Sequence, residues 1–314
     1  RRMQPCIHRR HKPIETENYM SIPVAYLGII LIWSTTPLAI QWSTQGMGFA
    51  FAVLARMLIG VTVAAVIVMV WRIGFPFHAR ARRAYLVGGL GMFCAMVLTY
   101  WGARYIHSGL ISVLFGLSPL VAGVLAALCL GERSLTPLRV VGMLLGALGL
   151  AVIFIHGDSL GGEHALAGLA ALLVAVFIYS ASLVWLKQIG DDSPPLATTV
   201  GTLAVSLPLF GLVWLLSDGQ LPTAVPARSG AAIVYLGVFG SVIGFALYYY
   251  VIKHLEASKV SLITLVTPVL ALLLGSLLNG EVVSLRLWLG TALILFGLTV
   301  HQWDSLLSLL RTSR

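Results

Sequence analysis

The sequence predicts an all-α integral membrane protein whose ten transmembrane helices form two inverted repeats of five helices each. Three observations support this prediction. Of the 314 residues, 59% are hydrophobic and only 10% are charged, whereas a soluble domain has roughly 25% charged residues. The chain contains ten apolar stretches of about the 20 residues that a helix needs to cross a bilayer. The second half of the chain also repeats the pattern of the first half.

Each predicted span is helical because a bilayer core offers no water to the polar groups of the backbone. The spans cover approximately residues 20–43, 49–70, 84–105, 108–130, 136–156, 165–187, 195–216, 230–252, 258–279 and 285–303. We expect one repeat at 20–156, an external linker at 157–164 and a second repeat at 165–303. A basic cytoplasmic arm, 1–19, would precede them, and a cytoplasmic tail, 304–314, would follow.

The distribution of basic residues predicts the orientation of these spans. Lys and Arg are retained on the cytoplasmic side of a membrane. The chain has 20 of them, and the segments that would face outward hold only Arg104, Arg228 and Arg286. Arg56 lies within a span, so the other sixteen fall on the side of the two termini. We therefore expect both termini in the cytoplasm, and we attribute the basic composition to topology and not to nucleic-acid binding.

The repeat is clearest in the fourth and ninth spans. SPLVAGVLAALCLGE at 118–132 matches TPVLALLLGSLLNGE at 267–281, and a shift of 149 positions superimposes both the Pro and the Gly-Glu pair. Five is an odd number, so the second copy must enter the membrane from the opposite face. Inverted repeats of this kind are typical of secondary transporters, which bind their substrate near the midplane between the two halves.

At these residues the chain resembles the EamA-type branch of the drug/metabolite transporter superfamily. The similarity covers residues 20–303, and its most specific element is the pair of Pro to Gly-Glu segments in register. The resemblance implies ten helices in two inverted repeats. It also implies a central cavity, lined chiefly by helices one to four and six to nine, and export or exchange of small metabolites or drugs. It does not identify a substrate.

Arg56 is the one basic residue well inside a span, about 10 Å along its helix from Phe49. A charge at that depth is costly and needs a reason. One hypothesis is that the guanidinium faces the cavity and pairs with a carboxylate of the substrate. The alternative is a structural role, in which the side chain snorkels outward or binds carbonyl groups of a neighbouring helix.

Aromatic side chains give a second group of candidates. Trp33 and Tyr179 fall mid-span beside hydroxyl residues and correspond between the halves, and a rigid aromatic wall suits an amphipathic solute. Other aromatics gather where the third and eighth spans end, where they could instead anchor the chain at the water interface. The predicted substrate-binding residues are Trp33, Thr36, Arg56, Tyr100, Trp101, Tyr179, Tyr248 and Tyr249.

The repeated motif adds candidates for movement and for capping. Pro119 and Pro268 would kink their helices, either as hinges or gates or as packing features. Glu132 and Glu281 would act as structural caps of the helices that follow them, with proton carriage as the less favoured alternative. The glycine-rich fifth and tenth spans would allow close contact between backbones.

Several residue patterns that other functions require are missing from the sequence. All eleven acidic residues lie in tails, in loops or at span ends, so no midplane carboxylate is available for sodium or proton coupling. The sequence has no Walker-type phosphate loop. Its three cysteines match no metal-binding spacing. We therefore expect no metal, no cofactor, no ATPase subunit, no nucleic-acid partner and no enzymatic activity.

The favoured function is that of a secondary transporter in the inner membrane, either an exporter or an exchanger. Its partners would be the lipid bilayer and a small-molecule substrate, with amino acids or related amphipathic solutes as the best candidates. We expect alternating access and a monomer or weak homodimer. The alternatives are multidrug efflux of cations, disfavoured by Arg56 and the missing midplane acid, and a receptor or scaffold that binds without transport.

Overall fold

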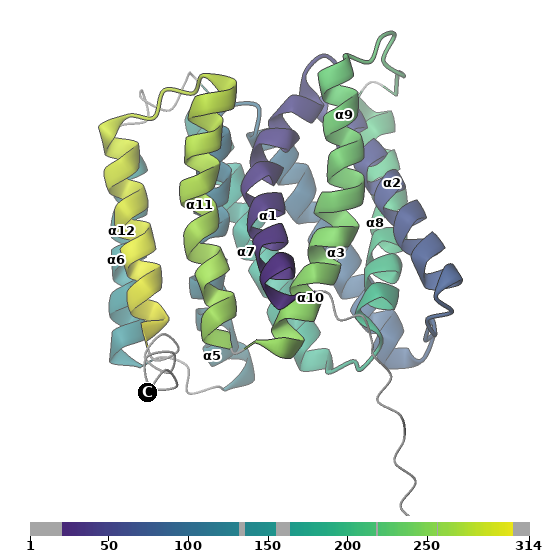
Figure 1. Cartoon of the computed structure of the whole chain (residues 1–314), viewed down its shortest axis with the longest axis horizontal. Coiled ribbons are helices and arrows are strands. Elements are labelled where there is room, and N and C mark those ends of the chain that lie inside the picture. The colour runs from purple at the N-terminus through teal and green to yellow at the C-terminus, as the bar shows by residue number, and fades with distance from the viewer. Residues whose placement is uncertain (1–20, 132–135, 155–163, 218, 256, 304–314) are drawn as a thin grey trace, which may run out of the picture.

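The computed structural model describes residues 21–131, 136–154, 164–217, 219–255 and 257–303. Every regular element in these residues is helical (Figure 1). The first half contains α1 (Ile22–Thr44), α2 (Phe49–Val70), α3 (Ala79–Gly102), α4 (Ser108–Phe115), α5 (Ser118–Leu130) and α6 (Pro137–Phe154). The second half contains α7 (Ala165–Ile189), α8 (Pro195–Ser217), α9 (Ala227–Tyr235), the π-helix η2 (Leu236–Ile243), α10 (Gly244–His254), α11 (Ala257–Asn279) and α12 (Leu285–His301).

The two halves run through the bundle in opposite directions. α1 begins and α12 ends at the same end of the bundle, here called the proximal end (Figure 1). The opposite end, where α4 begins and α11 ends, is the distal end. The first repeat starts with α1 running from proximal to distal, and the second starts with α7 running from distal to proximal. The predicted fold class, an all-α membrane protein with two inverted five-helix repeats, is therefore confirmed.

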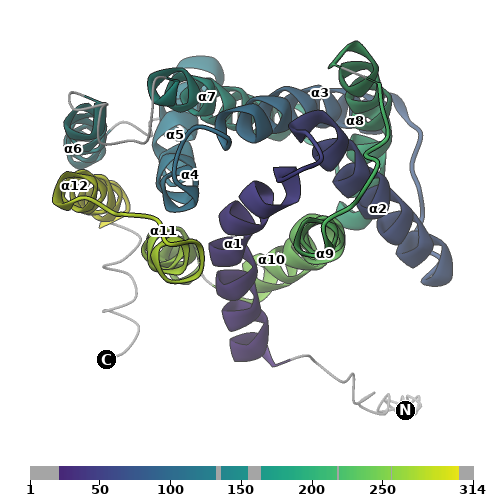
Figure 2. The same ribbon diagram turned by 90° about the horizontal axis from the view of Figure 1, so that it is seen from above.

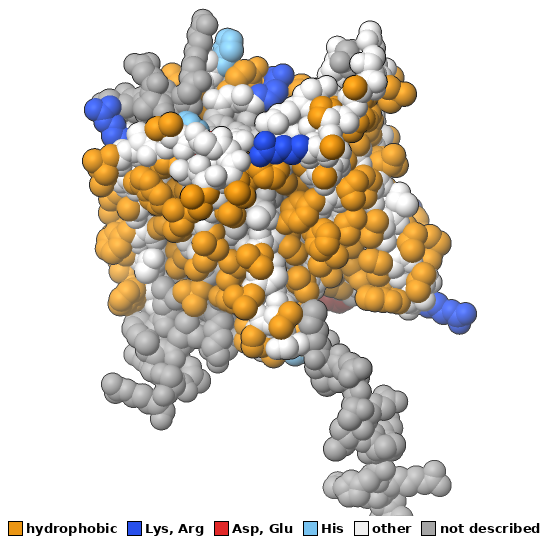
Figure 3. All heavy atoms as spheres, turned by 45° about the horizontal axis from the view of Figure 1, so that its top comes forward, with side chains coloured by type: hydrophobic (Ala, Val, Ile, Leu, Met, Phe, Trp, Pro, Cys, Tyr) orange, Lys and Arg blue, Asp and Glu red, His pale blue; other side chains and the backbone are white. Residues whose placement is uncertain are grey.

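The helices have the length and surface of membrane spans. Within the described residues, eight helical stretches are long and apolar enough to cross a bilayer, and α6 and α12 are shorter apolar helices. Figure 3 shows apolar side chains over the sides of the bundle, with the visible Lys and Arg side chains toward its ends. Leu31 and Leu277 are 62% and 79% exposed, as expected for side chains that face lipid. The chain is therefore a multi-pass membrane protein.

Glycines allow close contact between the backbones of α6 and α12, one from each half. α6 and α12 lie side by side at one lateral edge of the bundle, which is seen from above in Figure 2. A Cβ atom on Gly142 would lie 2.5 Å from the carbonyl oxygen of Gly297, and one on Gly149 would lie 2.6 Å from that of Gly290. Any larger residue would push the backbones apart, so this packing confirms the role expected for the glycine-rich fifth and tenth spans.

The two prolines of the repeated motif lie in different local structures. The fourth span passes through a turn at Gly116 and Leu117, both in right-handed helical conformation, and α5 starts at Ser118, so Pro119 occupies its first turn. That position suits proline because the first turn needs no donor from its nitrogen. Pro268 instead lies within the continuous helix α11. The first half thus has a tightened turn just before its proline, with Leu117 bonded to Leu114 three residues back, whereas the corresponding helix of the second half is continuous.

Candidate functional site

Arg56 lies inside the bundle, on the face of α2 that packs against η2. Its side chain is only 5% exposed. The Nε atom donates a hydrogen bond to Oγ of Ser241 at 3.2 Å, and Nη1 donates to the hydroxyl of Tyr100 at 3.4 Å. The guanidinium also lies 6.0 Å from the centre of the Tyr100 ring. Two predicted site residues, one from α2 and one from α3, are thus joined to a residue of the second half.

The π-helix η2 makes room for this guanidinium. A Cβ atom on Gly240 would lie 3.3 Å from Nη2 of Arg56 and 3.7 Å from Oγ1 of Thr36. On the preceding turn, a Cβ atom on Gly237 would lie 3.2 Å from the backbone oxygen of Arg56. Short π-helical segments are frequent at functional sites because they change the direction of side chains within a helix. Here Ser241 turns toward Arg56, and Gly240 leaves the adjacent space free of side-chain atoms.

The positive charge of Arg56 meets neutral partners. Both hydrogen bonds go to hydroxyl groups, and no carboxylate in the described part of the chain forms an ion pair with it. The acidic residues that the structure describes, Asp191, Asp192 and Glu281, lie at helix ends. A charged side chain at the bilayer centre costs about 2.5–3.5 kcal/mol on insertion scales. Arg56 therefore carries a buried charge that no carboxylate of the described residues balances.

An aromatic pair adjoins the same region. Trp33 on α1 and Tyr248 on α10 have ring centres 4.8 Å apart. A Cβ atom on Gly244 would lie 3.4 Å from Nε1 of Trp33, so this glycine lets the indole approach the start of α10. Trp33 precedes Thr36 by one helical turn, on the α1 face that meets η2 and α10. The rings and the guanidinium therefore border one region between α1, α2 and the π-helical segment.

The other predicted aromatic residues lie elsewhere. Tyr179 on α7 packs against Phe115, with ring centres 6.0 Å apart. Trp101 lies near the distal end of α3, where Arg104 stacks 5.8 Å from its ring centre and Tyr105 packs edge-on at 5.0 Å. The structure does not bring these two residues to the Arg56 region. The side chain of Tyr249 lies outside the described part of the chain.

The structure corrects the helix that Glu281 caps. The next helix, α12, is capped by Ser284, whose side chain accepts a hydrogen bond from the backbone nitrogen of Leu287. Glu281 is 8% exposed and instead accepts from the backbone nitrogen of Ser108 at 3.1 Å. This nitrogen belongs to the first residue of α4, in the other half of the chain. Gly280 adopts a left-handed conformation, φ 64°, that turns the chain after α11.

This carboxylate belongs to a network that joins the halves at the distal end. Asn279 donates from Nδ2 to Glu281 at 3.0 Å and to Oε1 of Gln41 at 3.1 Å. Gln41 in turn donates to the backbone oxygen of Ile106 at 2.6 Å, and Trp42 donates to Oδ1 of Asn279 at 3.1 Å. We call these five residues with Ser108 the distal network. The counterpart of Glu281 in the first half, Glu132, lies outside the described residues.

Sequence reasoning missed the residues that η2 contributes to the Arg56 region. Ser241 is separated from Arg56 by 185 positions, and a π-helix leaves no distinctive hydrophobic period. A local signal was present nonetheless. Gly237, Gly240 and Gly244 recur at spacings of three and four residues, which is the pattern of small residues on a helix face that another helix approaches closely.

Comparison with known proteins agrees with this architecture. The model of the EamA-like transporter family matches residues 20–155 and 166–301. An uncharacterized transporter of Archaeoglobus fulgidus is 30% identical over 69% of this chain and 76% of its own length. A probable terminal-alkyne amino-acid exporter of Streptantibioticus cattleyicolor is 31% identical over 81% of this chain and 84% of its own.

A solved crystal structure supports the fold independently. It has a TM-score of 0.63 and 22% identity, covering 91% of this chain and 98% of that chain. At this level of identity the likeness concerns the fold alone. The two family matches together span both five-helix repeats and leave few residues outside them. The chain therefore belongs to the EamA-like transporter family.

Proposed function

We propose that this protein is a secondary transporter that exports or exchanges small metabolites by alternating access. The inverted repeats support this proposal, since two similar halves can form inward-facing and outward-facing states of comparable energy. The proposed substrate site is the region bordered by Arg56, Tyr100, Thr36, Ser241, Trp33 and Tyr248. It lies where α1, α2 and α3 of the first half meet η2 and α10 of the second.

The proposed substrates are small amphipathic carboxylates, with amino acids as the first candidates. One observation carries this choice: Arg56 is 5% exposed and is bonded only to hydroxyl groups in the described part of the chain. A carboxylate can accept two parallel hydrogen bonds from a guanidinium. The rings of Trp33 and Tyr248 would contact the apolar part of the solute. The amino-acid exporter among the relatives supports the same substrate class.

The proposed orientation places the proximal end in the cytoplasm. The bias of Lys and Arg toward that end supports it. The distal network would then close the outer end of the bundle, and opening would require the Ser108 to Glu281 and Gln41 to Asn279 contacts to break. Opening of this end would release the solute outward.

Transport by purified protein in liposomes tests the proposal. Labelled amino acids, their uncharged amides and a cationic dye would be compared for the unmodified chain, Arg56→Gln and Arg56→Lys. We expect Arg56→Gln to reduce carboxylate transport at least about tenfold, the equivalent of one lost charged hydrogen bond. Transport of an amide should change little, and Arg56→Lys should retain part of the carboxylate transport.

Arg104→Gln is the matched control, because Arg104 lies at the distal end against Phe49, with its guanidinium 4.7 Å from that ring centre. It removes the same charge at a distance from the proposed site. Equal loss of carboxylate and amide transport in Arg56→Gln would assign Arg56 a structural role. Transport of the dye alone would favour multidrug efflux, and binding of a solute without flux would favour a receptor.

A further inference from the structure

A hollow lies at the proximal end of the bundle, between the first turns of α3 and the last turns of α7. Its volume is about 560 Å³. It is separate from the proposed substrate site, whose residues come from α1, α2, η2 and α10 and from the distal half of α3. The lining residues are Arg80, Arg83, Leu86, Val87, Trp185, Gln188 and Ile189.

The lining combines charge at the water edge with apolar surface toward the membrane. Arg80, Arg83 and Val87 follow one another at spacings of three and four residues, so they share one face of α3. Both arginines are exposed, and Gln188 adds an amide from α7. Leu86 and Trp185 are 52% and 59% exposed. A polar mouth and an apolar wall therefore meet at the depth where a span begins.

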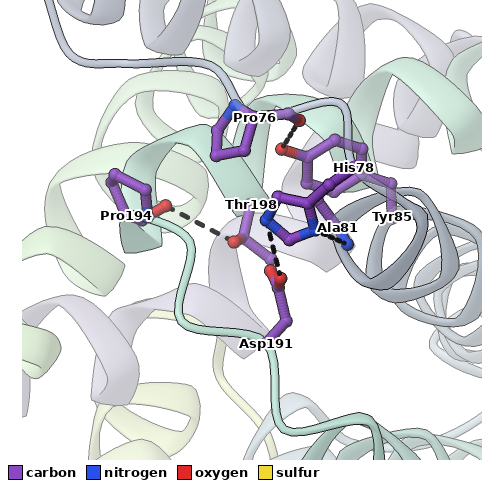
Figure 4. Close-up of polar contacts among 7 residues, drawn as sticks. All are labelled: Pro76, His78, Ala81, Tyr85, Asp191, Pro194 and Thr198. Carbon is purple, nitrogen blue, oxygen red and sulfur yellow. Dashed lines mark hydrogen bonds and ion pairs between the residues drawn. The ribbon is translucent and has the colours of Figure 1, made fainter.

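The two arginines have no acidic partner among the residues that the structure describes. The acid nearest in sequence to the α7 side of the hollow is Asp191, and its carboxylate lies 3.6 Å from Nε2 of His78 (Figure 4). The other ring nitrogen of His78 accepts from the backbone nitrogen of Ala81 at 3.2 Å, and the hydroxyl of Tyr85 donates to the backbone oxygen of Pro76. The approach of His78 to Asp191 links the residue before α3 to the end of α7. No ion pair between Arg80 or Arg83 and a described acidic residue forms, so both guanidinium groups can bind an anion.

We propose that this hollow binds the head group of an anionic phospholipid from the leaflet at the proximal end. Arg80 and Arg83 would hold the phosphate, because a guanidinium matches phosphate oxygens with paired donors. Trp185 would sit at the head-group level, where tryptophan is enriched. Leu86, Val87 and Ile189 would line the start of an acyl chain. Basic pockets between spans on the cytoplasmic side are typical of such lipid sites.

This site ties together helices from both halves, α3 and α7. A bound lipid would therefore stabilise the folded bundle in proportion to its concentration relative to its dissociation constant. The proposal does not depend on the identity of the transported solute, and its test needs no transport measurement. Zwitterionic lipid, with the same acyl chains and no net charge, is the natural reference.

The test measures binding of phosphatidylglycerol and phosphatidylcholine to the purified full chain in detergent, by native mass spectrometry and by thermal unfolding. We expect preferential binding of phosphatidylglycerol to the unmodified chain. The double variant Arg80→Gln/Arg83→Gln should weaken that binding about tenfold or more, since it removes two charged contacts. The double variant Arg72→Gln/Arg82→Gln removes the same charge from exposed positions outside the hollow and should change binding less than about twofold.

A second variant tests the proposal independently, in case the first double variant does not fold. Gln188→Glu keeps both arginines and places a negative charge in the hollow, so it should weaken binding of phosphatidylglycerol and not of phosphatidylcholine. Equal losses in the two double variants would overturn the proposal, because they would indicate general attraction to a basic surface. Binding of glycerol 3-phosphate alone as tightly as of phosphatidylglycerol would also overturn it, since the acyl chains would then contribute nothing and a free phosphate compound would be the ligand.

Discussion

Removing the charge of Glu281 should open the distal end. The carboxylate accepts hydrogen bonds from the backbone nitrogen of Ser108 at 3.1 Å and from Asn279 at 3.0 Å. Glu281→Gln keeps an acceptor oxygen but loses the negative charge. A charged acceptor makes such a hydrogen bond stronger than a neutral one by about 1 kcal/mol. The substitution also loses the attraction to the start of α4, which adds about 0.3–2 kcal/mol depending on burial. Together these terms amount to about 1–3 kcal/mol, or about 5- to 150-fold in the closed-to-open ratio.

Thiol labelling measures this ratio. Ser112 lies one turn beyond Ser108 on α4 and is 9% exposed, so Ser112→Cys in a background without the native cysteines reports opening. A membrane-impermeant maleimide added from the distal side should label the Glu281→Gln form about 5- to 150-fold faster. Asp192→Asn removes a charge at the proximal end and should leave the rate unchanged. Unchanged or slower labelling in Glu281→Gln would refute the reasoning, because desolvation of the carboxylate would then outweigh its bonds.

Two further substitutions follow from the glycine contacts. Gly142→Ala would place a methyl group 2.5 Å from a backbone oxygen of α12, so thermal unfolding should show a loss of about 1–3 kcal/mol. Gly211→Ala meets no atom within 4 Å and should be neutral or stabilising, so a similar loss there would show that the contact is not the cause. Gly240→Ala would approach Arg56 Nη2 to 3.3 Å and should lower carboxylate transport while leaving the unfolding temperature within a few degrees; unaltered transport would remove Gly240 from the site.

Much of the architecture could be predicted because hydrophobic length and charge bias act locally. The second predicted span, 49–70, coincides with α2, Phe49–Val70. The repeat predicted the inversion because an odd number of crossings reverses the second copy. The turn between α4 and α5 was harder to predict. The same proline motif follows a turn in one half and lies within a continuous helix in the other, so the motif alone does not determine the local structure.

Only some residues of the proposed site could be predicted from the sequence. Arg56 was evident because a buried charge in a span is rare, and Trp33 because it lies mid-span among hydroxyl residues. Their partners were not evident, since the contact of Arg56 with Ser241 depends on the path of η2. Glu281 shows the same limit. Its position after Gly280 indicated a helix cap. The helix that it caps is α4, whose Ser108 nitrogen donates to the Glu281 carboxylate across 173 sequence positions. Sequence spacing carries no information about such a distant partner.

The turn in the fourth span distinguishes the two halves. Between α4 and α5 the backbone nitrogen of Leu117 bonds to the oxygen of Leu114, three residues back, whereas α11 continues as one α-helix through Pro268. A deformation that bends the first half between α4 and α5 would therefore move α11 of the second half as one straight unit. Two halves built on one motif would thus bend at different places when the bundle deforms.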